Sequence, residues 1–463
     1  MSSGLFRAIR CGAVATFFLL ASLISASAAE VLILSDLHFD PTANKALVDR
    51  LAVAQPEDWP AILASDDHRL SSYGADSNWE LLASALDAAS AEPKPAFVLI
   101  TGDFLVHQFR MRFDSAATDH SDAAFRVFVR KTMRFLALQL TQAVPNTPML
   151  AALGNNDDNC DDYTLRPGGS FLIDTVATVG NLIGIEAGPD FQRSWLGLGN
   201  YVVPNPALQD HLVVALNTNF FSPHYKNLCG TAADGNPARA TLAWLRQVLR
   251  DAEATHRKVW IAYHIPPGID APATTRKNSC PMTPAPMFAE AYAQEFHALM
   301  KRYRATVTAS FAGHTHMDGF RLLSDGGKAF GFVLMNPAVS PIFGQNPAFR
   351  RITLTEDGVI ADESVHYLAN LAAAASGAQP EWRMETRDDA AWGMPRYDLA
   401  SLGALYRRIS SDPAARDRWL DSYVVQGPAR SAVTPANEAI YRCTAGYDRT
   451  ADFAACSCAG ANR

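Results

Sequence analysis

The chain has 463 residues and a formal net charge of −7 at pH 7, from 40 basic and 47 acidic side chains. A chain of this length can bury a large core, or it can combine one main domain with an appendage. The acidic balance argues against a surface that binds nucleic acid or anionic membranes, so neither partner is expected.

The first 29 residues have the three parts of a secretory signal peptide. Arg7 and Arg10 precede an apolar core from Cys11 to Ile24, and the small residues of Ser25–Ala29 follow it. The core is shorter than the ~20 residues that a membrane-spanning helix needs, which favours cleavage over the alternative of a single membrane anchor. No later stretch is apolar for long enough to cross a bilayer. We therefore expect an exported protein, either secreted or periplasmic.

Strands and helices alternate up to about Ala329. The first strand is expected at Glu30–Ser35, and the polar stretch Asp40–Asn78 is interpreted as loops over the site because it has little periodicity. Further strands are predicted at Thr147–Leu153, Leu212–Leu216, Lys258–Ala262, Thr306–Phe311 and Phe330–Met335, and helices at Asn78–Ala91, Asp122–Ala143, Pro237–Glu253 and Pro286–Arg304. This alternation predicts an α/β architecture.

The pattern changes in the C-terminal third of the chain. Ile352–Thr355 and Val359–Tyr367 flank a Glu-Asp-Gly turn, which predicts a hairpin in a second sheet. From about Met384 onward, short helices are expected at Leu399–Ile409, Ala414–Val424 and Pro435–Ala445. We interpret this last part as a helical appendage pinned to the body of the protein.

Six cysteines remain once the signal peptide is removed: Cys160, Cys229, Cys280, Cys443, Cys456 and Cys458. An even number in an exported protein predicts disulfides, although the connectivity stays open. A thiolate zinc site is the alternative, but Cys456-Ser-Cys458 is spaced too closely for a typical zinc knuckle.

Five apolar strands end in side chains that can bind metal ions. They are followed by Asp36 and His38, by Asp103, by Asn155, by His264, and by His314 and His316. Open sheets place ligand crevices at the ends of their strands. Oxygen and imidazole donors without thiolate suit Zn²⁺, with Mn²⁺ or Fe as alternatives. The sequence therefore predicts two divalent metal ions at one edge of the fold.

Asp103 is the predicted shared ligand. Two-metal hydrolases hold their ions about 3.5–4 Å apart, and a hydroxide that bridges them attacks phosphorus in line. A single Asp-x-His or Gly-His-x-His would be weak evidence, because strand-end turns and core histidines use the same residues. Five such elements, each after an apolar strand, make that alternative the weaker one.

These motifs also identify a resemblance. The order Asp36-x-His38, Gly102-Asp103, Gly154-Asn155-Asn156, His264 and Gly313-His314-Thr315-His316 resembles the calcineurin-like metallophosphoesterase superfamily. Within it, the chain is similar to the acid sphingomyelinase-like phosphodiesterase branch, which also contains the vacuolar endopolyphosphatases. The resemblance covers about Val31–Asn370 and a helical C-terminal tail.

The resemblance implies an α+β fold, a four-layer sandwich of the α/β type in which helices flank two β-sheets. Together with the patterns described above, it predicts a signal peptide at residues 1–29, a catalytic domain at 30–383 and the helical appendage at 384–463. It assigns one metal ion to Asp36, His38, Asp103 and His316, and the other to Asp103, Asn155, His264 and His314. It also implies disulfides between Cys229 and Cys280 and between Cys443 and Cys456, which leaves Cys160 and Cys458 as a possible third pair.

Two residues bear on catalysis. The branch places a histidine near the leaving group where this chain has His107, although a surface or supporting histidine is an equal alternative. Many relatives have Gly-Asn-His, but Asn156 occupies the last position here, and an amide cannot supply a proton. His107 must then protonate the leaving group, or the substrate must need less help.

The expected function is that of an exported dinuclear-metal phosphoester hydrolase, of the acid sphingomyelinase-like phosphodiesterase type. Asn156 leaves an endopolyphosphatase open, and a non-catalytic protein that binds metal or phosphate is the alternative from another class. No lipid-binding helical module precedes the first strand. A soluble phosphodiester, nucleotide or polyphosphate is therefore a more probable substrate than a lipid taken from a bilayer.

Overall fold

The structure is a computed structural model that describes residues 29–459, apart from 66–68, 185–187, 228–234, 277–279 and 387–391. The expected signal peptide spans residues 1–29, and all of it except Ala29 lies outside the described residues. Among the described helices, none is both long enough and apolar enough to span a membrane.

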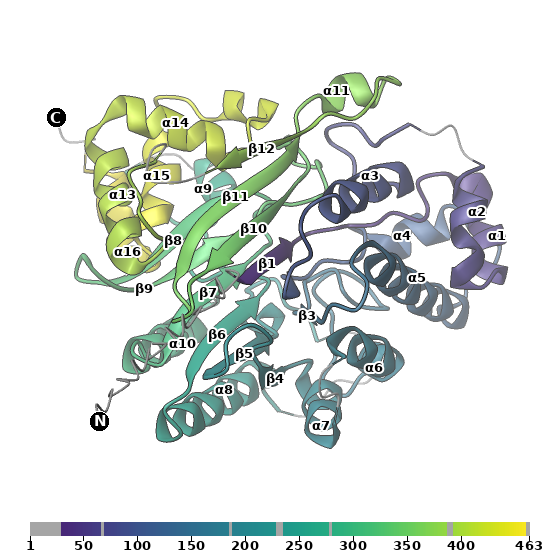
Figure 1. The fold of residues 1–463 in the computed structure, drawn as a ribbon, viewed down its shortest axis with the longest axis horizontal. Coiled ribbons are helices and arrows are strands. Elements are labelled where there is room, and N and C mark those ends of the chain that lie inside the picture. The colour runs from purple at the N-terminus through teal and green to yellow at the C-terminus, as the bar shows by residue number, and fades with distance from the viewer. Residues whose placement is uncertain are drawn as a thin grey trace, which may run out of the picture.

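Two six-stranded sheets form the centre of the protein (Figure 1). The first has the order β12 (Trp382–Thr386), β11 (Ile360–Leu368), β10 (Ala348–Leu354), β1 (Ala29–Leu34), β2 (Phe97–Ile100) and β3 (Met149–Ala151). The second has the order β4 (Tyr201–Pro204), β5 (His211–Leu216), β6 (Lys258–Tyr263), β7 (Val307–Ala312), β9 (Lys328–Met335) and β8 (Gly319–Asp325). The expected α+β sandwich of two sheets with flanking helices is thereby confirmed.

Each sheet has a parallel core. β1, β2 and β3 run parallel in the first sheet, and β5, β6, β7 and β9 do so in the second. The residues of β2 are all buried, as is expected of parallel strands that are covered on both faces. The parallel strands therefore deliver the loops that follow them to one edge of each sheet.

Several of the long helices begin at capping side chains. Asn78 accepts a hydrogen bond from the amide of Leu81 at the start of α3 (Trp79–Ser90), and Ser121 does the same for α5 (Asp122–Ala143). α8 (Pro237–Ala254) and α10 (Glu290–Arg302) also lie close to their predicted positions. The helices α6 (Ser170–Ile183) and α7 (Pro189–Leu198) were not assigned from the sequence.

The interpretation of Asp40–Asn78 as loops was wrong in part. This stretch contains α1 (Val48–Val53) and α2 (Trp59–Leu63), joined to short 3-10 turns. Both helices are too short to show a full period of apolar residues, and Trp59 is buried among helices that are distant in sequence. Tertiary packing, rather than local pattern, therefore orders this segment.

The C-terminal helices pack against β8 and β9 and lie together on one side of the molecule (Figure 1). They are α13 (Leu399–Ser411), α14 (Pro413–Tyr423), α15 (Glu438–Gly446) and α16 (Thr450–Ser457). The boundary expected at residue 384 stays a prediction, because β12 continues the first sheet to Thr386 and residues 387–391 are not described.

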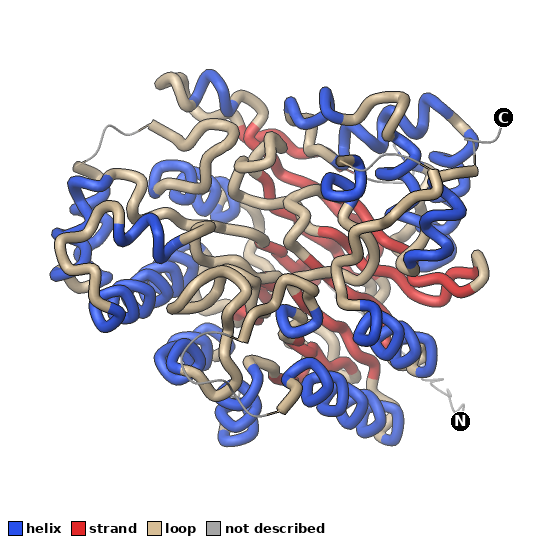
Figure 2. The backbone as a smooth tube through the Cα atoms, turned by 180° about the vertical axis from the view of Figure 1, so that it is seen from behind, coloured by secondary structure: helices blue, strands red, loops and turns tan. Residues whose placement is uncertain are grey.

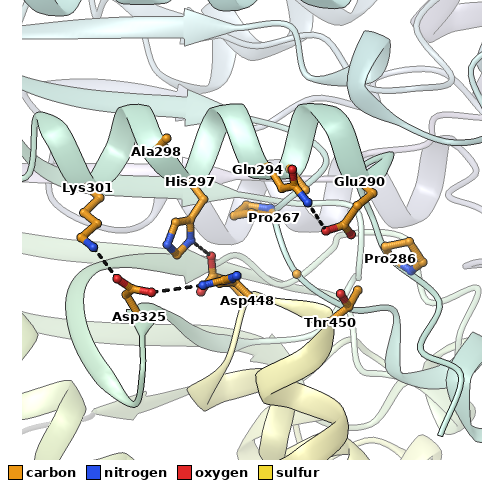
Figure 3. A pocket seen from close by; sticks show the side chains of 13 residues that line it. Pro267, Pro286, Glu290, Gln294, His297, Ala298, Lys301, Asp325, Asp448 and Thr450 are labelled. Carbon is orange, nitrogen blue, oxygen red and sulfur yellow. Dashed lines mark hydrogen bonds and ion pairs between the residues drawn. The ribbon is translucent and has the colours of Figure 1, made fainter.

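Polar contacts join these helices to the main body (Figure 3). Nδ1 of His297, on α10, lies 2.7 Å from a carboxylate oxygen of Asp448, and the other oxygen of Asp448 accepts a hydrogen bond from the amide of Ser324. Arg449 pairs with Asp325 at 3.1 Å. The segment is thus fixed to the second sheet at several points.

The disulfides correct part of the expected pairing. Cys443 and Cys456 are bonded, which confirms that pair. Cys280 is bonded to Cys458, so the expected pairs Cys229–Cys280 and Cys160–Cys458 are wrong; Cys229 itself lies outside the described residues. The fold brings Cys458 at the end of α16 to a Cα distance of 5.9 Å from Cys280, a proximity between residues 178 apart that no spacing could reveal.

Candidate active site

The predicted ligands lie on the loops that leave five of the parallel strands. Asp36 and His38 follow β1, Asp103 follows β2, Asn155 follows β3, His264 follows β6, and His314 and His316 follow β7. Seen from behind, loops cover the middle of the molecule while most helices lie at its periphery (Figure 2). The first sheet thus supplies four of the seven residues and the second sheet supplies three.

The loops after β1 and β2 continue side by side beyond the strands. The amide of Asp36 donates to the carbonyl of Gly102, and the amide of His38 donates to the carbonyl of Asp103, both at 3.0 Å. Strand pairing is thereby extended into the site. It fixes the spacing between two ligand segments that are more than sixty residues apart in the chain.

Five of the seven residues have a left-handed backbone, with φ of 47° at Asp36, 39° at His38, 54° at Asp103, 71° at His314 and 61° at His316. This conformation is uncommon for residues other than glycine. It interrupts the extended chain, in which residues two apart would share a face but lie about 6.6 Å from each other. Nε2 of His38 thereby lies 3.8 Å from a carboxylate oxygen of Asp36. Such strain persists where the surrounding structure enforces it, and it is concentrated at functional sites.

Two motif glycines allow the loops to approach this closely. A Cβ atom on Gly154 would lie 2.0 Å from Oδ1 of Asp103. A Cβ atom on Gly313 would lie 2.3 Å from the hydroxyl of Ser35 and 2.6 Å from the carboxylate of Asp36. No other residue type fits at these positions without displacing a predicted ligand.

Asp103 lies between imidazoles from both sheets. Its Oδ2 is 3.0 Å from Nε2 of His264 and 3.4 Å from Nε2 of His38. Its Oδ1 accepts a hydrogen bond from the amide of Asn156 at 2.8 Å. The carboxylate is 2% exposed, so it is almost fully removed from solvent.

The backbone that carries Asp103 is held by Asp157. The buried carboxylate of Asp157 accepts hydrogen bonds from the amides of Asp103 at 3.0 Å, Phe104 at 2.8 Å, Leu105 at 3.2 Å and Gly154 at 2.7 Å. Asp157 directly follows the Gly154-Asn155-Asn156 motif, but spacing alone does not distinguish a backbone acceptor from a metal ligand. This role was therefore not predicted.

The ligand atoms form two groups that share Asp103. Asp36, His38 and Asp103 have ligand atoms within 4.8 Å of one another, and so do Asp103, His264 and His314. Nε2 of His316 lies 3.4 Å from the carboxylate of Asp36. The structure thus brings together the Asp and His residues that the sequence singled out, in two groups that meet at Asp103.

The residues fit a cation centre. Oδ1 of Asn155 is buried and accepts no hydrogen bond from a described residue, so it is available to a bound cation or water molecule. Nδ1 of His38 lies 3.0 Å from the carbonyl of Leu105, and Nδ1 of His264 lies 2.8 Å from that of Thr101. If each Nδ1–H donates to its carbonyl, both Nε2 lone pairs are free for a metal ion. The donors are nitrogen and oxygen atoms, as divalent transition metals prefer.

Burial shifts the pKa values of the side chains in the cluster. Burial raises the pKa of Asp36 to about 7 and lowers the pKa of His38 to about 4. Burial alone would lower the pKa of His264, but the carboxylates of Asp103 and Asp36 outweigh it and raise that pKa to about 9. Protons and metal ions compete for such ligands, so metal affinity depends on pH.

His107 lies beside the cluster, in a pair that the sequence did not reveal. Its ring stacks on His38 at a centroid distance of 4.0 Å, and its Nδ1 lies 3.0 Å from a carboxylate oxygen of Asp76. Burial alone would lower the pKa of His107, but the hydrogen bond and the charge of Asp76 raise it above its ordinary value. Asp76 also accepts a hydrogen bond from the hydroxyl of Ser340 at 3.0 Å.

A cavity of about 480 Å³ opens over the cluster. Asp103, His107, Asn155, Asn156, His314 and His316 lie along its inner side, and part of its rim comes from the C-terminal segment. The side chain of His107 is 24% exposed, so it can reach a molecule in this cavity. The site therefore combines buried metal-binding groups with an accessible histidine.

Comparison with known proteins agrees with this arrangement. Residues 29–318 match the family model of the calcineurin-like phosphoesterases, and the chain belongs to this family. It is a distant homologue of the acid sphingomyelinase-like phosphodiesterases over most of its length.

Two relatives show how far the sequences have diverged. The chain is 26% identical over 410 residues to acid sphingomyelinase-like phosphodiesterase 3b of Mus musculus, covering 83% of this chain and 80% of the relative. It is 25% identical over 398 residues to the cyclic GMP-AMP phosphodiesterase SMPDL3A of Mus musculus, covering 81% of this chain and 80% of the relative.

Solved structures show a weaker likeness. A dimetal phosphatase from Danio rerio has a TM-score of 0.41 and 12% identity, covering 78% of this chain and 100% of the other. PhoD has a TM-score of 0.45 and 11% identity, covering 78% of this chain and 69% of the other.

The close approach at Gly313 leads to a testable prediction. We expect Gly313→Ala to lower metal affinity on the order of 10–100-fold, because the new methyl group displaces the carboxylate of Asp36. The measurement is metal content after dialysis, by inductively coupled plasma mass spectrometry. Gly197→Ala is the matched control, since a Cβ atom there meets nothing within 4 Å. Equal metal content in the two variants would contradict this account of the glycine.

Proposed function

We propose that this protein is an exported phosphodiesterase with a dinuclear metal centre. The observation that carries the proposal is the position of Asp103, whose Oδ2 lies 3.0 Å from His264 of one sheet and 3.4 Å from His38 of the other. One carboxylate between ligands from two sheets is the arrangement that two-metal hydrolases use to share a group.

The proposed ligands follow the two groups that meet at Asp103. Asp36, His38, Asp103 and His316 hold one ion, and Asp103, Asn155, His264 and His314 hold the other. The unpartnered oxygen of Asn155 supports its inclusion. Two divalent ions, Zn²⁺ in the first instance with Mn²⁺ or Fe as alternatives, would supply a nucleophile from water and neutralise charge on the phosphate oxygens.

The chain's own residues orient the substrate and supply a proton. His107 is the proposed general acid for the leaving oxygen, because it is accessible from the cavity and its Nδ1 is paired with Asp76. That pairing leaves Nε2 to carry the transferred proton. Asn156 has a supporting role, since its amide N–H donates to Asp103 and its side chain has no acidic proton.

A phosphodiester substrate and export are the finer parts of the proposal. Two of the similar proteins are named as phosphodiesterases, which supports a phosphodiester for a member of the same family. The disulfides Cys280–Cys458 and Cys443–Cys456 support export, because disulfides persist in oxidising compartments. The sequence of residues 1–29 supports it independently.

The first test removes the shared ligands. We expect Asp103→Asn and His264→Ala each to abolish hydrolysis of bis(4-nitrophenyl) phosphate, and chelation of the wild-type protein to do the same reversibly, because the nucleophile depends on the metal ions. His120→Ala is the control, since its side chain is exposed and lies outside the cavity lining. Turnover retained in both ligand variants would refute the proposal. Tight binding of two metal ions without hydrolysis of any activated ester would instead favour a non-catalytic metal or phosphate binder.

The second test concerns the proton donor. We expect His107→Gln to lower kcat by about 10²–10⁴-fold for a diester with a poor alkyl leaving group and far less for bis(4-nitrophenyl) phosphate, because nitrophenolate leaves without protonation. Asp76→Asn should also lower kcat for the alkyl diester, but more weakly. It should move the alkaline limb of the pH–rate profile to lower pH, because the charge of Asp76 raises the pKa of His107. An equal loss of activity on both substrates would show that His107 supports the site in some other way.

A further inference from the structure

One wall of the active-site cavity comes from the C-terminal segment rather than from the loops that carry the proposed ligands. Tyr423, Val424, Ala429, Ala432, Val433 and Tyr441 all line it. They belong to the end of α14, to α15 and to the connection between these helices. This wall has no ionisable group other than two tyrosine hydroxyls.

Phe343 continues this apolar wall towards the proposed general acid. The residue is 52% exposed, and its ring lies at a centroid distance of 4.6 Å from His316 and 5.9 Å from His107. A Cβ atom on the neighbouring Gly344 would lie 3.5 Å from the Cβ atom of Ala429, so the two parts of the wall are adjacent. An accessible aromatic face thus lies next to the place where a leaving group would depart.

The charges of the cavity do not suit a polyanion. Among the described lining residues, apart from the proposed ligands and His107, Arg276 and Arg321 are matched in number by Asp162 and Asp270. Arg321 is buried, and its guanidinium donates to the carbonyls of Pro267 at 2.5 Å and Ile269 at 2.9 Å. Recognition of a polyphosphate chain would require several free cations in a row, since each unit carries a negative charge.

The wall is held rigidly against the catalytic loops. The amide of Ala429 donates to the carbonyl of Gly344, the side chain of Asn346 donates to the carbonyl of Val425, and the amide of Asp318 donates to the carbonyl of Tyr423, each at 2.9 Å. The contacts around Asp448 fix the same segment further away (Figure 3). The Cys280–Cys458 disulfide does so as well. The wall is therefore organised before any ligand binds.

The turn after α14 is also strained. Val425 and Gln426 have φ of 51° and 56°, and a β-branched residue in this region is a true outlier. A Cβ atom on the next residue, Gly427, would lie 2.6 Å from the carbonyl oxygen of Gly344, so the backbones are packed as closely as glycine permits. Strain of this kind is found at ligand clamps and active sites.

We infer that Phe343 and the cavity-lining residues of the C-terminal segment form the subsite for the leaving group, and that this group is an uncharged organic alcohol with an apolar or aromatic face rather than a phosphate. The inference rests on the proposed function, because it names the substrate class of the same site. It assigns the C-terminal segment a direct part in specificity. Burial of an apolar face against this wall supplies the binding free energy.

Hydrolysis by three variants tests the inference. We expect Phe343→Ala to lower kcat/KM for bis(4-nitrophenyl) phosphate about tenfold and to leave hydrolysis of tripolyphosphate unchanged, since a ring contact of this kind contributes about one factor of ten. Ala432→Arg, at an exposed position, should lower the hydrolysis of bis(4-nitrophenyl) phosphate and raise that of tripolyphosphate. Met384→Ala is the control, because that side chain is 57% exposed and lies outside the cavity lining. Equal changes on both substrates, or wild-type preference for tripolyphosphate, would overturn the inference.

Equilibrium binding separates this inference from the proposed function. Calorimetry with diphenylphosphinate, whose P–C bonds resist hydrolysis, should show affinity that falls about tenfold in Phe343→Ala, while methylenediphosphonate should bind both proteins equally. If that result is found without turnover of any ester, the subsite stands and the proposed activity fails. If esters are hydrolysed but the affinity for diphenylphosphinate is the same in both proteins, the activity stands and the subsite fails.

Discussion

The four hydrogen bonds that Asp157 accepts from backbone amides determine where Asp103 lies. They join the loop after β2 to the loop after β3 and leave the Asp103 side chain free to face the second sheet. Hydrogen bonds to a carboxylate are stronger than those between neutral groups, and a buried environment strengthens them further. The proposed metal centre depends on that placement, because the candidate ligand groups Asp36-His38-Asp103 and Asp103-His264-His314 both include Asp103.

The arrangement costs free energy that the rest of the fold must offset. Five residues of the cluster have left-handed backbones, and Asp36, Asp103 and Asp157 are buried close together. Two six-stranded sheets and their flanking helices supply the compensating apolar burial. Bound cations would relieve the repulsion among the carboxylates, so binding of metal ions and stability of the fold are coupled.

Local sequence was enough to predict which Asp and His residues gather around Asp103 and most of the strands that carry them. An apolar run of five or six residues followed by glycine or a polar side chain is visible without any knowledge of tertiary structure, as at Ala96–Ile100 before Gly102-Asp103. The long helices were also predicted, because α5 and α8 each show several turns of apolar periodicity.

The features that failed prediction depend on contacts between distant segments. Asp76 reaches His107 across 31 positions, and Cys458 reaches Cys280 across 178. The apolar wall that the C-terminal segment contributes lines the cavity only because the C-terminal helices pack on the second sheet. Short helices such as α1 and α2 carry too few residues for periodicity to separate them from loops.

The most direct test of the central claim, that two metal ions share Asp103, is anomalous X-ray diffraction from crystals of the protein with its native metals. The account predicts two anomalous peaks about 3.5–4 Å apart, one on each side of the Asp103 carboxylate. A single peak, or peaks bound by residues other than those at the ends of β1, β2, β3, β6 and β7, would contradict it.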